Sequence, residues 1–81
     1  MRLLSYNCRG LGSKRAVRAL KSLLRQASLQ VVFLMETKQT DEENEEVRKE
    51  LGFPEGESWP ADTTRGGRAG GLSICWVEEI G

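Results

Sequence analysis

The sequence contains no histidine, so it lacks the side chain most often used for general acid–base catalysis near neutral pH. Cysteine is also scarce: Cys8 and Cys75 lie far apart and form no CxxC pair. These two absences exclude the usual zinc-binding spacings and a disulfide framework. We expect two reduced, partly buried thiols in an intracellular protein.

Long apolar runs are absent as well. Only Leu3 and Leu4 precede the first polar residues at the N-terminus, so the sequence has no hydrophobic region typical of a signal peptide. No stretch approaches the ~20 apolar residues that a membrane-spanning helix needs. We expect an intracellular protein without membrane contact, and the pattern leaves a nuclear location open.

The chain has 81 residues, of which 38% are hydrophobic, and this length allows one small domain with a modest core. Its 12 basic and 12 acidic residues give zero net charge but are unevenly distributed. Residues 1–38 are mainly basic, whereas residues 39–57 are mainly acidic. Such segregation of charge can mark a half of the molecule that faces nucleic acid, but it more often reflects two helices whose exposed faces differ in charge.

The first part of the sequence predicts a strand, a helix and a second strand. Residues 2–6 favour a strand, and residues 13–28 show helical periodicity with Ser13 as the N-cap. One helix face gathers apolar side chains: Val17, Leu20, Leu23, Leu24 and Ala27. Residues 29–35 form a continuous apolar run, which predicts a strand buried on both faces. This βαβ unit predicts two parallel strands.

The second part predicts a polar helix and a hairpin. Thr40 and Glu43 have capping-box spacing, and Gly52 supplies a helix stop. The apolar contacts of this helix are expected at Val47, Leu51 and Phe53. We expect residues 54–60 to form a turn and the remainder to form a hairpin. That hairpin has a short polar strand, a glycine turn at Gly66–Gly67, and a strand over residues 71–77. The order β-α-β-α-β-β indicates an α/β fold with a mixed sheet.

The turn from Asn7 to Gly12 is the first candidate site. Gly10 and Gly12 match part of a dinucleotide-binding GxGxxG motif, but Arg15 occupies the third glycine position. For the glycines alone, a simple strand-to-helix turn is the favoured interpretation. A small nucleotide- or nucleic-acid-binding module that uses this turn stays open as an alternative.

The second candidate is the pair Asn7 and Glu36, which follow or end neighbouring parallel strands. Because ligands gather at strand ends in α/β sheets, their side chains are expected to converge. An amide oxygen and a carboxylate suit Mg²⁺, which keeps several waters for a substrate phosphate. An alternative of about equal weight is a surface glutamate that pairs with Lys38.

The third candidate is a set of basic residues: Arg9, Lys38, Arg65 and Arg68. Arg9 and Lys38 flank the same predicted sheet edge, where both could contact a phosphate. The bases of the first predicted helix lie opposite its apolar arc, so a solvated face explains them best.

Four segments in order and spacing resemble a known family: "LLSYNCRGLGSKRAVRALKSLLR", "VVFLMETK", "VRKELGF" and "GGLSICW". They are similar to the N-terminal part of a domain of the endonuclease/exonuclease/phosphatase superfamily, in the branch of plant LINE-type (non-LTR) retrotransposons. The resemblance covers nearly the whole chain but only about the first third of that domain. It implies a partial four-layer α/β sandwich of the DNase I type.

The resemblance also implies a chemistry, the hydrolysis of DNA phosphodiesters with Mg²⁺ or Mn²⁺. It identifies Asn7 with the family asparagine that orders the phosphate and metal shell, and Glu36 with the metal-binding glutamate. Tyr6 stands where the family often has tryptophan, and Met35 replaces a common glutamine.

Later catalytic residues of the family, an asparagine, aspartates and a histidine, have no counterpart here. We therefore expect residues 1–81 to be a truncated endonuclease domain that is inactive alone. A non-functional remnant is the other alternative. A half sandwich leaves an apolar sheet face and an unpaired edge, so we expect weak metal binding and self-association through the edge.

Overall fold

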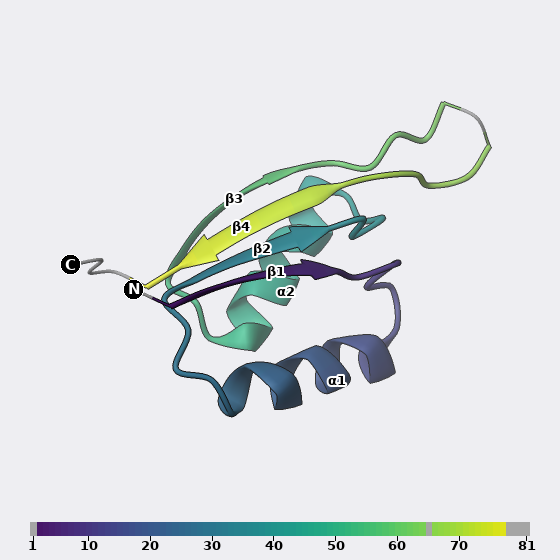
Figure 1. Cartoon of the computed structure of the whole chain (residues 1–81). Coiled ribbons are helices and arrows are strands. Elements are labelled where there is room, and N and C mark those ends of the chain that lie inside the picture. The colour runs from purple at the N-terminus through teal and green to yellow at the C-terminus, as the bar shows by residue number, and fades with distance from the viewer. Residues whose placement is uncertain (1, 65, 78–81) are drawn as a thin grey trace.

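The computed structural model describes residues 2–64 and 66–77, which fold into two helices and a four-stranded sheet (Figure 1). The predicted order β-α-β-α-β-β and the α/β class are confirmed. The elements are β1 (Leu3–Asn7), α1 (Lys14–Arg25), β2 (Val31–Met35), α2 (Asp41–Leu51), β3 (Glu55–Trp59) and β4 (Leu72–Trp76).

The sheet has the strand order β1-β2-β4-β3 and is mixed. β1 and β2 run parallel, with Asn7 paired to Met35, as the predicted βαβ unit requires. β4 runs antiparallel to both β2 and β3. Because β1 and β2 are parallel neighbours, they finish side by side at one end of the sheet. The loop to α1 and the long β3–β4 connection lie at the same end (Figure 1).

Helix α1 begins at the predicted N-cap, because the Ser13 hydroxyl accepts a hydrogen bond from the Ala16 N–H at 3.1 Å. The helix ends at Arg25 and not near residue 28, since the Gln26 N–H already closes a tighter turn onto Leu23. Leu20 is buried, but Leu23 of the predicted apolar arc is 44% exposed. The predicted arc was therefore too wide, and α1 packs through its narrower centre.

Helix α2 has the predicted capping box: the Glu43 N–H donates to Thr40, and the Thr40 N–H donates to the Glu43 carboxylate. Gly52 ends it in the left-handed conformation, with φ +86°. The predicted apolar contacts are also found, since Val47 and Phe53 are buried and Leu51 packs against them.

The prediction of a turn over residues 54–60 was wrong, because residues 55–59 form the edge strand β3. β3 pairs with β4, and such pairing outweighs the low strand propensity of Gly56 and its neighbours. The glycine is needed, since a Cβ at Gly56 would lie 2.6 Å from the Arg48 Cδ and 2.8 Å from the Ile74 carbonyl oxygen.

The predicted hairpin is confirmed only in part: its first strand is β3, and in place of the short polar strand expected after residue 60 there is only an isolated bridge between Asp62 and Ala69. Its second strand lies within residues 71–77, and the connection beyond β3 is tied by reciprocal Asp62–Ala69 backbone hydrogen bonds of 2.7 and 3.0 Å. Gly66, in the predicted turn, has φ +77°. This connection, residues 60–64 and 66–71 of the described chain, extends past the end of the sheet, and we call it the β3–β4 arm (Figure 1).

The prediction that β2 is buried on both faces was also wrong. Val32 and Leu34 are fully buried, whereas Met35 is 38% exposed and Val31 and Phe33 are half-buried. Both helices lie on the same face of the sheet (Figure 1), and the other face is not covered by any described element. The core lies between that helical layer and the sheet: Leu11, Leu20, Val32, Leu34, Val47, Phe53 and Cys75.

The thiols are free, as expected, with Cys75 buried and Cys8 half-buried. Among residues 2–64 and 66–77, no helix is both long and apolar enough to cross a membrane.

Candidate functional site

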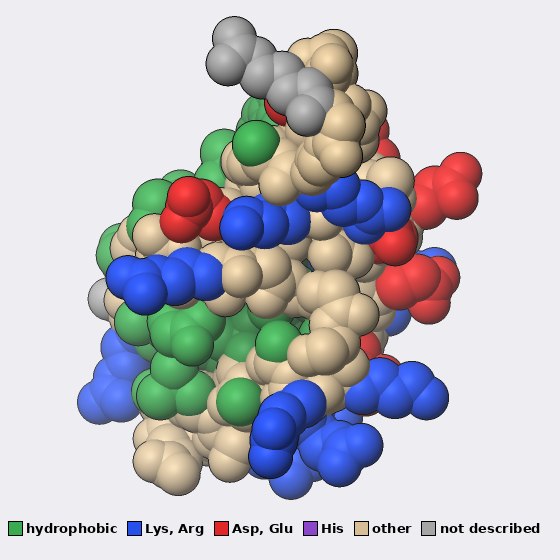
Figure 2. All heavy atoms as spheres, turned by 90° about the vertical axis from the view of Figure 1, so that its right-hand side faces the viewer, with side chains coloured by type: hydrophobic (Ala, Val, Ile, Leu, Met, Phe, Trp, Pro, Cys, Tyr) green, Lys and Arg blue, Asp and Glu red, His purple; other side chains and the backbone are tan. Residues whose placement is uncertain are grey.

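Asn7 and Glu36 lie at the same edge of the sheet. Asn7 is the last residue of β1 and pairs with Met35, which immediately precedes Glu36. Beyond the strands, the Cys8 N–H donates to the Met35 carbonyl and the Gly10 N–H donates to the Glu36 carbonyl, both at 2.8 Å. Figure 2 views this end of the molecule. The parallel pairing thus continues into the turn, and the backbones of the two predicted site residues are adjacent.

The backbone at this edge takes unusual conformations. Arg9, Glu36 and Lys38 have φ values of +53°, +51° and +55°, in the left-handed region that residues with a Cβ seldom occupy. Such conformations cost about 1–3 kcal/mol each and persist only where surrounding structure enforces them. All three residues were predicted site residues, and strained backbone gathers at functional sites. None of the three residues is a glycine, so no residue type in the sequence indicated these left-handed conformations.

Two flanking segments enforce the conformation of residues 36–38. On one side, the Leu11 N–H donates to the Thr37 carbonyl at 2.9 Å. On the other side, the Thr37 N–H donates to Gly71 at 3.2 Å, and the Lys38 N–H donates to Gly70 at 2.8 Å. Thr37 is fully buried between these segments. Residues 36–38, which we call the strap, are therefore held by backbone hydrogen bonds on both sides, between the β1–α1 loop and the β3–β4 arm.

The Glu36 carboxylate itself is exposed and has no hydrogen-bond or ion-pair partner among the residues described. Some acidic residues elsewhere are engaged in ion pairs: Glu43 pairs with Arg68, and Glu45 pairs with Arg48, each at 2.6 Å. The predicted alternative of an ion pair between Glu36 and Lys38 is not formed in the described structure. Glu36 therefore remains available to a cation from solution.

Asn7 has a local role in addition to its position. Its side-chain oxygen accepts a hydrogen bond from the Arg9 N–H at 3.2 Å, which forms a turn and supports the left-handed backbone of Arg9. Because an amide oxygen has two lone pairs, one remains for another ligand. The side chain of Asn7 is exposed at the end of β1.

The basic residues divide into two groups. Arg9 is exposed, and a Cβ placed on Gly10 would lie 3.7 Å from the Lys38 Cδ, so the Lys38 stem lies beside the loop that carries Arg9. Arg68, in contrast, is already engaged by the Glu43 carboxylate and donates to the Lys38 carbonyl at 3.3 Å. Arg68 thus fastens the arm to the start of α2, while Arg65 of the same predicted set lies outside the described residues.

The donors at this edge fit part of a divalent-metal site. A carboxylate from Glu36 and an amide oxygen from Asn7 are hard ligands, and Mg²⁺ is commonly held by one or two carboxylates together with water and substrate phosphate. No group of three or more His, Cys, Asp or Glu side chains able to hold a metal occurs in the described part of the chain. Asn7 and Glu36 alone would therefore hold a metal weakly.

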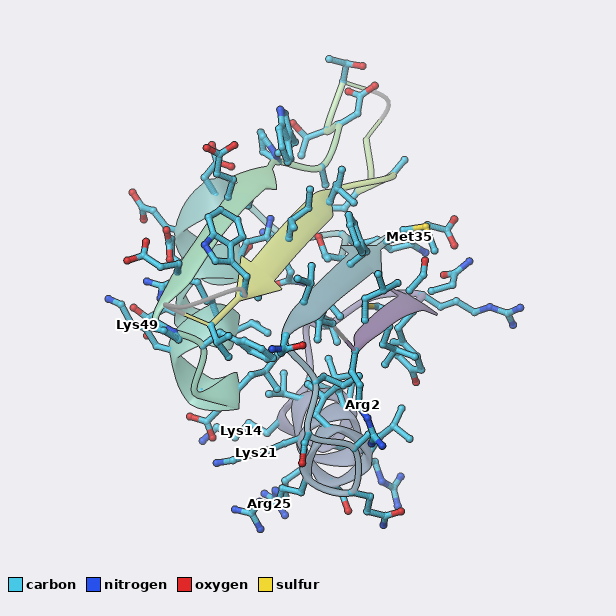
Figure 3. The ribbon with its side chains drawn as sticks, turned by 60° about the vertical axis from the view of Figure 1, so that its left-hand side comes forward. Arg2, Lys14, Lys21, Arg25, Met35 and Lys49 are labelled. Carbon is cyan, nitrogen blue, oxygen red and sulfur yellow. The ribbon has the colours of Figure 1, made fainter. Side chains whose placement is uncertain are left out.

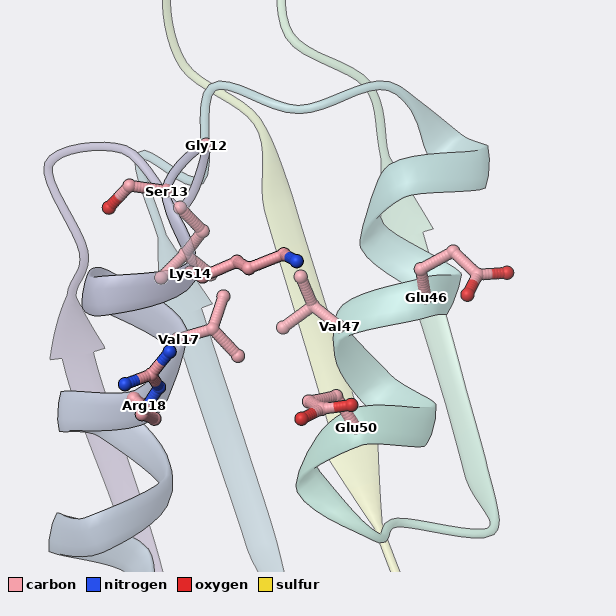
Figure 4. Close-up of a pocket in the computed structure, with 9 residues that line it drawn as sticks. Gly12, Ser13, Lys14, Val17, Arg18, Glu46, Val47 and Glu50 are labelled. Carbon is pink, nitrogen blue, oxygen red and sulfur yellow. The ribbon is translucent and has the colours of Figure 1, made fainter.

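A cavity of about 450 Å³ lies elsewhere, between α1 and α2 (Figure 4). Val17 and Val47 line it, and Lys14 extends across it from α1 toward α2 (Figure 4). Gly12 borders the cavity, whereas Asn7 and Glu36 do not. The cavity beside Gly12 and the strand ends that carry Asn7 and Glu36 are therefore two separate places on the molecule.

In comparisons with known proteins, no family model matches the sequence, and no curated protein matches it. Membership of the family that the sequence motifs resemble is therefore a proposal, and it depends on those motifs and on the geometry of the strand ends.

Proposed function

We propose that this chain is the N-terminal part of a Mg²⁺-dependent phosphodiesterase or endonuclease-like domain of retroelement origin, with Glu36 as its metal-binding carboxylate. One observation carries the proposal: Glu36 is exposed and unpaired among the described residues, and the left-handed segment that bears it is held by backbone hydrogen bonds next to the strand end at Asn7. A left-handed conformation is energetically unfavourable for a glutamate, and such conformations cluster at functional sites, so the backbone at Glu36 supports a functional role.

Each side chain at the edge has a role in this proposal. Glu36 holds the metal, and the Asn7 amide orients the phosphate and completes the oxygen ligands that this chain supplies. Arg9 and Lys38, which flank the pair, contact phosphate oxygens through charge-assisted hydrogen bonds. A bound Mg²⁺ polarises a phosphoryl oxygen and neutralises charge that develops on the leaving oxygen.

The fold class implied by the resemblance, a partial four-layer α/β sandwich, belongs to the same proposal. It is supported by the one-sided packing of the sheet, since the two described helices cover a single face and leave the other apolar. A sandwich packs two such faces together about 10 Å apart.

DNA is the proposed partner. Helix α1 has basic residues and no acidic ones: Lys14, Arg15, Arg18, Lys21 and Arg25. Arg25 extends from α1 away from the sheet, whereas Lys21 extends toward α2 (Figure 3). Lys21 lies 3.8 Å from the Glu50 carboxylate, so part of this charge is balanced within the molecule. The remaining bases would add sequence-independent attraction to phosphates.

We propose further that the chain by itself does not cleave DNA. The sequence has no histidine, and Asn7 and Glu36 supply no group placed to activate a water molecule. A plasmid-nicking assay in Mg²⁺ tests this proposal, with the Glu36→Ala variant beside the parent chain. We expect no nicking by either protein. Robust nicking by the parent that disappears in Glu36→Ala would overturn the proposed inactivity.

The second candidate function is a nucleotide-binding module at the Asn7–Gly12 turn. The observation in its favour is that Gly12, Ser13 and Lys14 border the cavity between the helices. Arg15 at the third glycine position counts against it. Saturable binding of ATP or NAD that is lost in Gly12→Val would establish this alternative, and absence of binding at millimolar nucleotide would remove it.

A further inference from the structure

The cavity between α1 and α2 lies outside the proposed metal site and has the size of a ligand pocket. Its volume is about 450 Å³, and pockets for small molecules have volumes of roughly 300–1,000 Å³. Its lining comes from the β1–α1 loop, the first turns of α1 and the second half of α2. The chemistry of these three segments indicates what kind of molecule the cavity can hold.

The base of the cavity is apolar. Leu11 and Val47 line it and are buried members of the core, and the half-buried Val17 packs against that core. Val17 and Val47 point toward each other from the two helices (Figure 4). The core therefore continues into the cavity as an apolar surface, and a hydrocarbon group that covers this surface displaces water from it.

Lys14 brings an unpaired positive charge to this apolar surface. Its side chain extends from α1 across the cavity toward α2 (Figure 4). Among the residues described, neither Lys14 nor Arg18, which also lines the cavity, takes part in an ion pair. The Lys14 ammonium group is therefore available to an anion that enters the cavity from solution.

The two acidic residues of the lining do not neutralise this charge. Glu46 points away from α1 (Figure 4), and the Glu50 carboxylate already lies 3.8 Å from the Lys21 ammonium. Helix α1 also has no acidic residue in its first turn, so the positive end of the helix dipole borders the cavity uncompensated. The α1 side of the cavity is therefore electropositive.

We propose that this cavity binds a small organic anion with an apolar body, such as the carboxylate of a short hydrocarbon chain. The carboxylate accepts charge-assisted hydrogen bonds from the Lys14 ammonium, while Arg18 adds attraction at the rim. The hydrocarbon covers Val17 and Val47. Charge and apolar surface together select this class: a neutral hydrocarbon leaves Lys14 unpaired, and an inorganic anion leaves the two valines in contact with water.

This ligand differs from the nucleotide considered above for the neighbouring glycine turn. A nucleotide brings a polar base and sugar, whose hydrogen-bonding groups the side chains of Val17 and Val47 cannot satisfy. The inference is also independent of the proposed metal site, because neither Asn7 nor Glu36 lines the cavity. Failure of one proposal therefore leaves the other unchanged.

An NMR titration of the isotope-labelled whole chain with three six-carbon probes tests the charge of the ligand. Hexanoate should bind with a dissociation constant on the order of 1 mM and shift the amides of residues 11–18 and 46–50. Hexanol should bind more weakly, and hexylammonium about tenfold more weakly, because a cation is repelled by Lys14. Equal binding of hexanoate and hexylammonium, or shifts that map outside the cavity, would overturn the proposal.

A series of carboxylates tests the apolar body. From butanoate through hexanoate to octanoate, each added CH₂ group should strengthen binding about threefold as it covers the valines. Acetate and inorganic phosphate have no apolar body and should bind more weakly than hexanoate. Affinity that does not depend on chain length, or phosphate binding as tight as that of hexanoate, would show a site for charge alone and refute the proposed class.

Lys14→Gln identifies the group that holds the anion. Glutamine keeps a polar side chain but removes the charge, so the affinity for hexanoate should fall about tenfold. Lys49→Gln is the matched control, since Lys49 is an exposed lysine of α2 outside the cavity and should leave the affinity unchanged. Because both lysines are exposed, we expect both variants to fold, and their amide spectra check this. Equal affinities of the parent and Lys14→Gln would contradict the proposal.

Discussion

Thr37 and Gly71 approach each other so closely that a Cβ on Gly71 would lie 2.5 Å from the Thr37 hydroxyl oxygen. The Thr37 N–H also donates to the Gly71 carbonyl at 3.2 Å. Gly71 has φ +89°, which a glycine adopts without strain. This contact joins the β3–β4 arm to the strap that presents Glu36, so the position of Glu36 depends on a glycine far away in the sequence.

Gly71→Ala should therefore destabilise the fold more than an ordinary glycine substitution. We expect a loss of about 3 kcal/mol, because left-handed strain is added to a clash that only a shift of Thr37 or Lys38 relieves. Gly66→Ala is the matched control: its φ is +77°, but no atom lies within 4 Å of the new Cβ. It should cost about 1 kcal/mol. Urea unfolding measures both values, and equal losses would show that the Thr37–Gly71 contact is unimportant.

The capping box of α2 should make stability depend on pH. The hydrogen bond from the Thr40 N–H, followed by the contact with Arg68, lowers the pKa of the Glu43 carboxyl. A lowered pKa in the folded state means that this group stabilises the fold above its unfolded pKa of about 4.3. That contribution is lost as the pH falls through the folded pKa.

Glu43→Gln tests this dependence, since glutamine keeps the capping hydrogen bond but does not titrate. We expect the stability difference between parent and variant to be greatest near neutral pH and to shrink in acid. Thermal unfolding at neutral pH and near pH 3 measures it. Glu46→Gln on the same helix is the control, and a pH-independent difference for Glu43→Gln would count against the assigned role.

Cys8 should react slowly with alkylating reagents. Burial, followed by the neighbouring Cys75 thiol, raises the pKa of Cys8 to about 11. Because the thiolate is the reactive form, a shift from the ordinary value of about 8.5 lowers reactivity on the order of 100-fold near pH 8.5. Mass spectrometry after iodoacetamide treatment, in native buffer and in urea, measures the ratio. Equal rates in the two conditions would contradict the assigned environment.

Asn44→Leu should stabilise the protein by about 1 kcal/mol. The Asn44 side chain is 1% exposed, and neither its amide nitrogen nor its oxygen has a hydrogen-bond partner among the described residues. Leucine has the same number and branching of side-chain heavy atoms and removes that desolvation penalty. The urea midpoint of Asn44→Leu should rise above that of the parent, while Asn44→Asp should lower it. A lower midpoint for Asn44→Leu would indicate that the amide is satisfied by solvent.

Local signals predicted the first half of the fold well. Ser13 and Thr40 were recognisable caps because their side chains bond the adjacent backbone, and the apolar run that ends at Met35 is a strand. Residues 55–59 were missed because β3 depends on pairing with β4, a contact distant in sequence. The open side of β2 was missed for a related reason: an apolar run does not reveal which of its faces another layer covers.

The candidate site was predictable in its residues but not in its construction. Parallel strands place Asn7 and Glu36 at one edge, and this follows from the βαβ pattern alone. The left-handed backbone of Glu36 and the burial of Thr37 depend on hydrogen bonds from two other segments. Neither residue is of a type that indicates such a conformation, so sequence reasoning had no signal for the strap.

The central claim is that Glu36 binds a divalent metal, and titration of the isotope-labelled chain with Mn²⁺ tests it most directly. A paramagnetic ion broadens the amide resonances nearest to it. We predict that broadening begins around Asn7 and residues 36–38, is lost in Glu36→Gln, and persists in Glu46→Gln, which removes an exposed acid from α2. Broadening that begins on the acidic face of α2 and is unchanged in Glu36→Gln would contradict the claim.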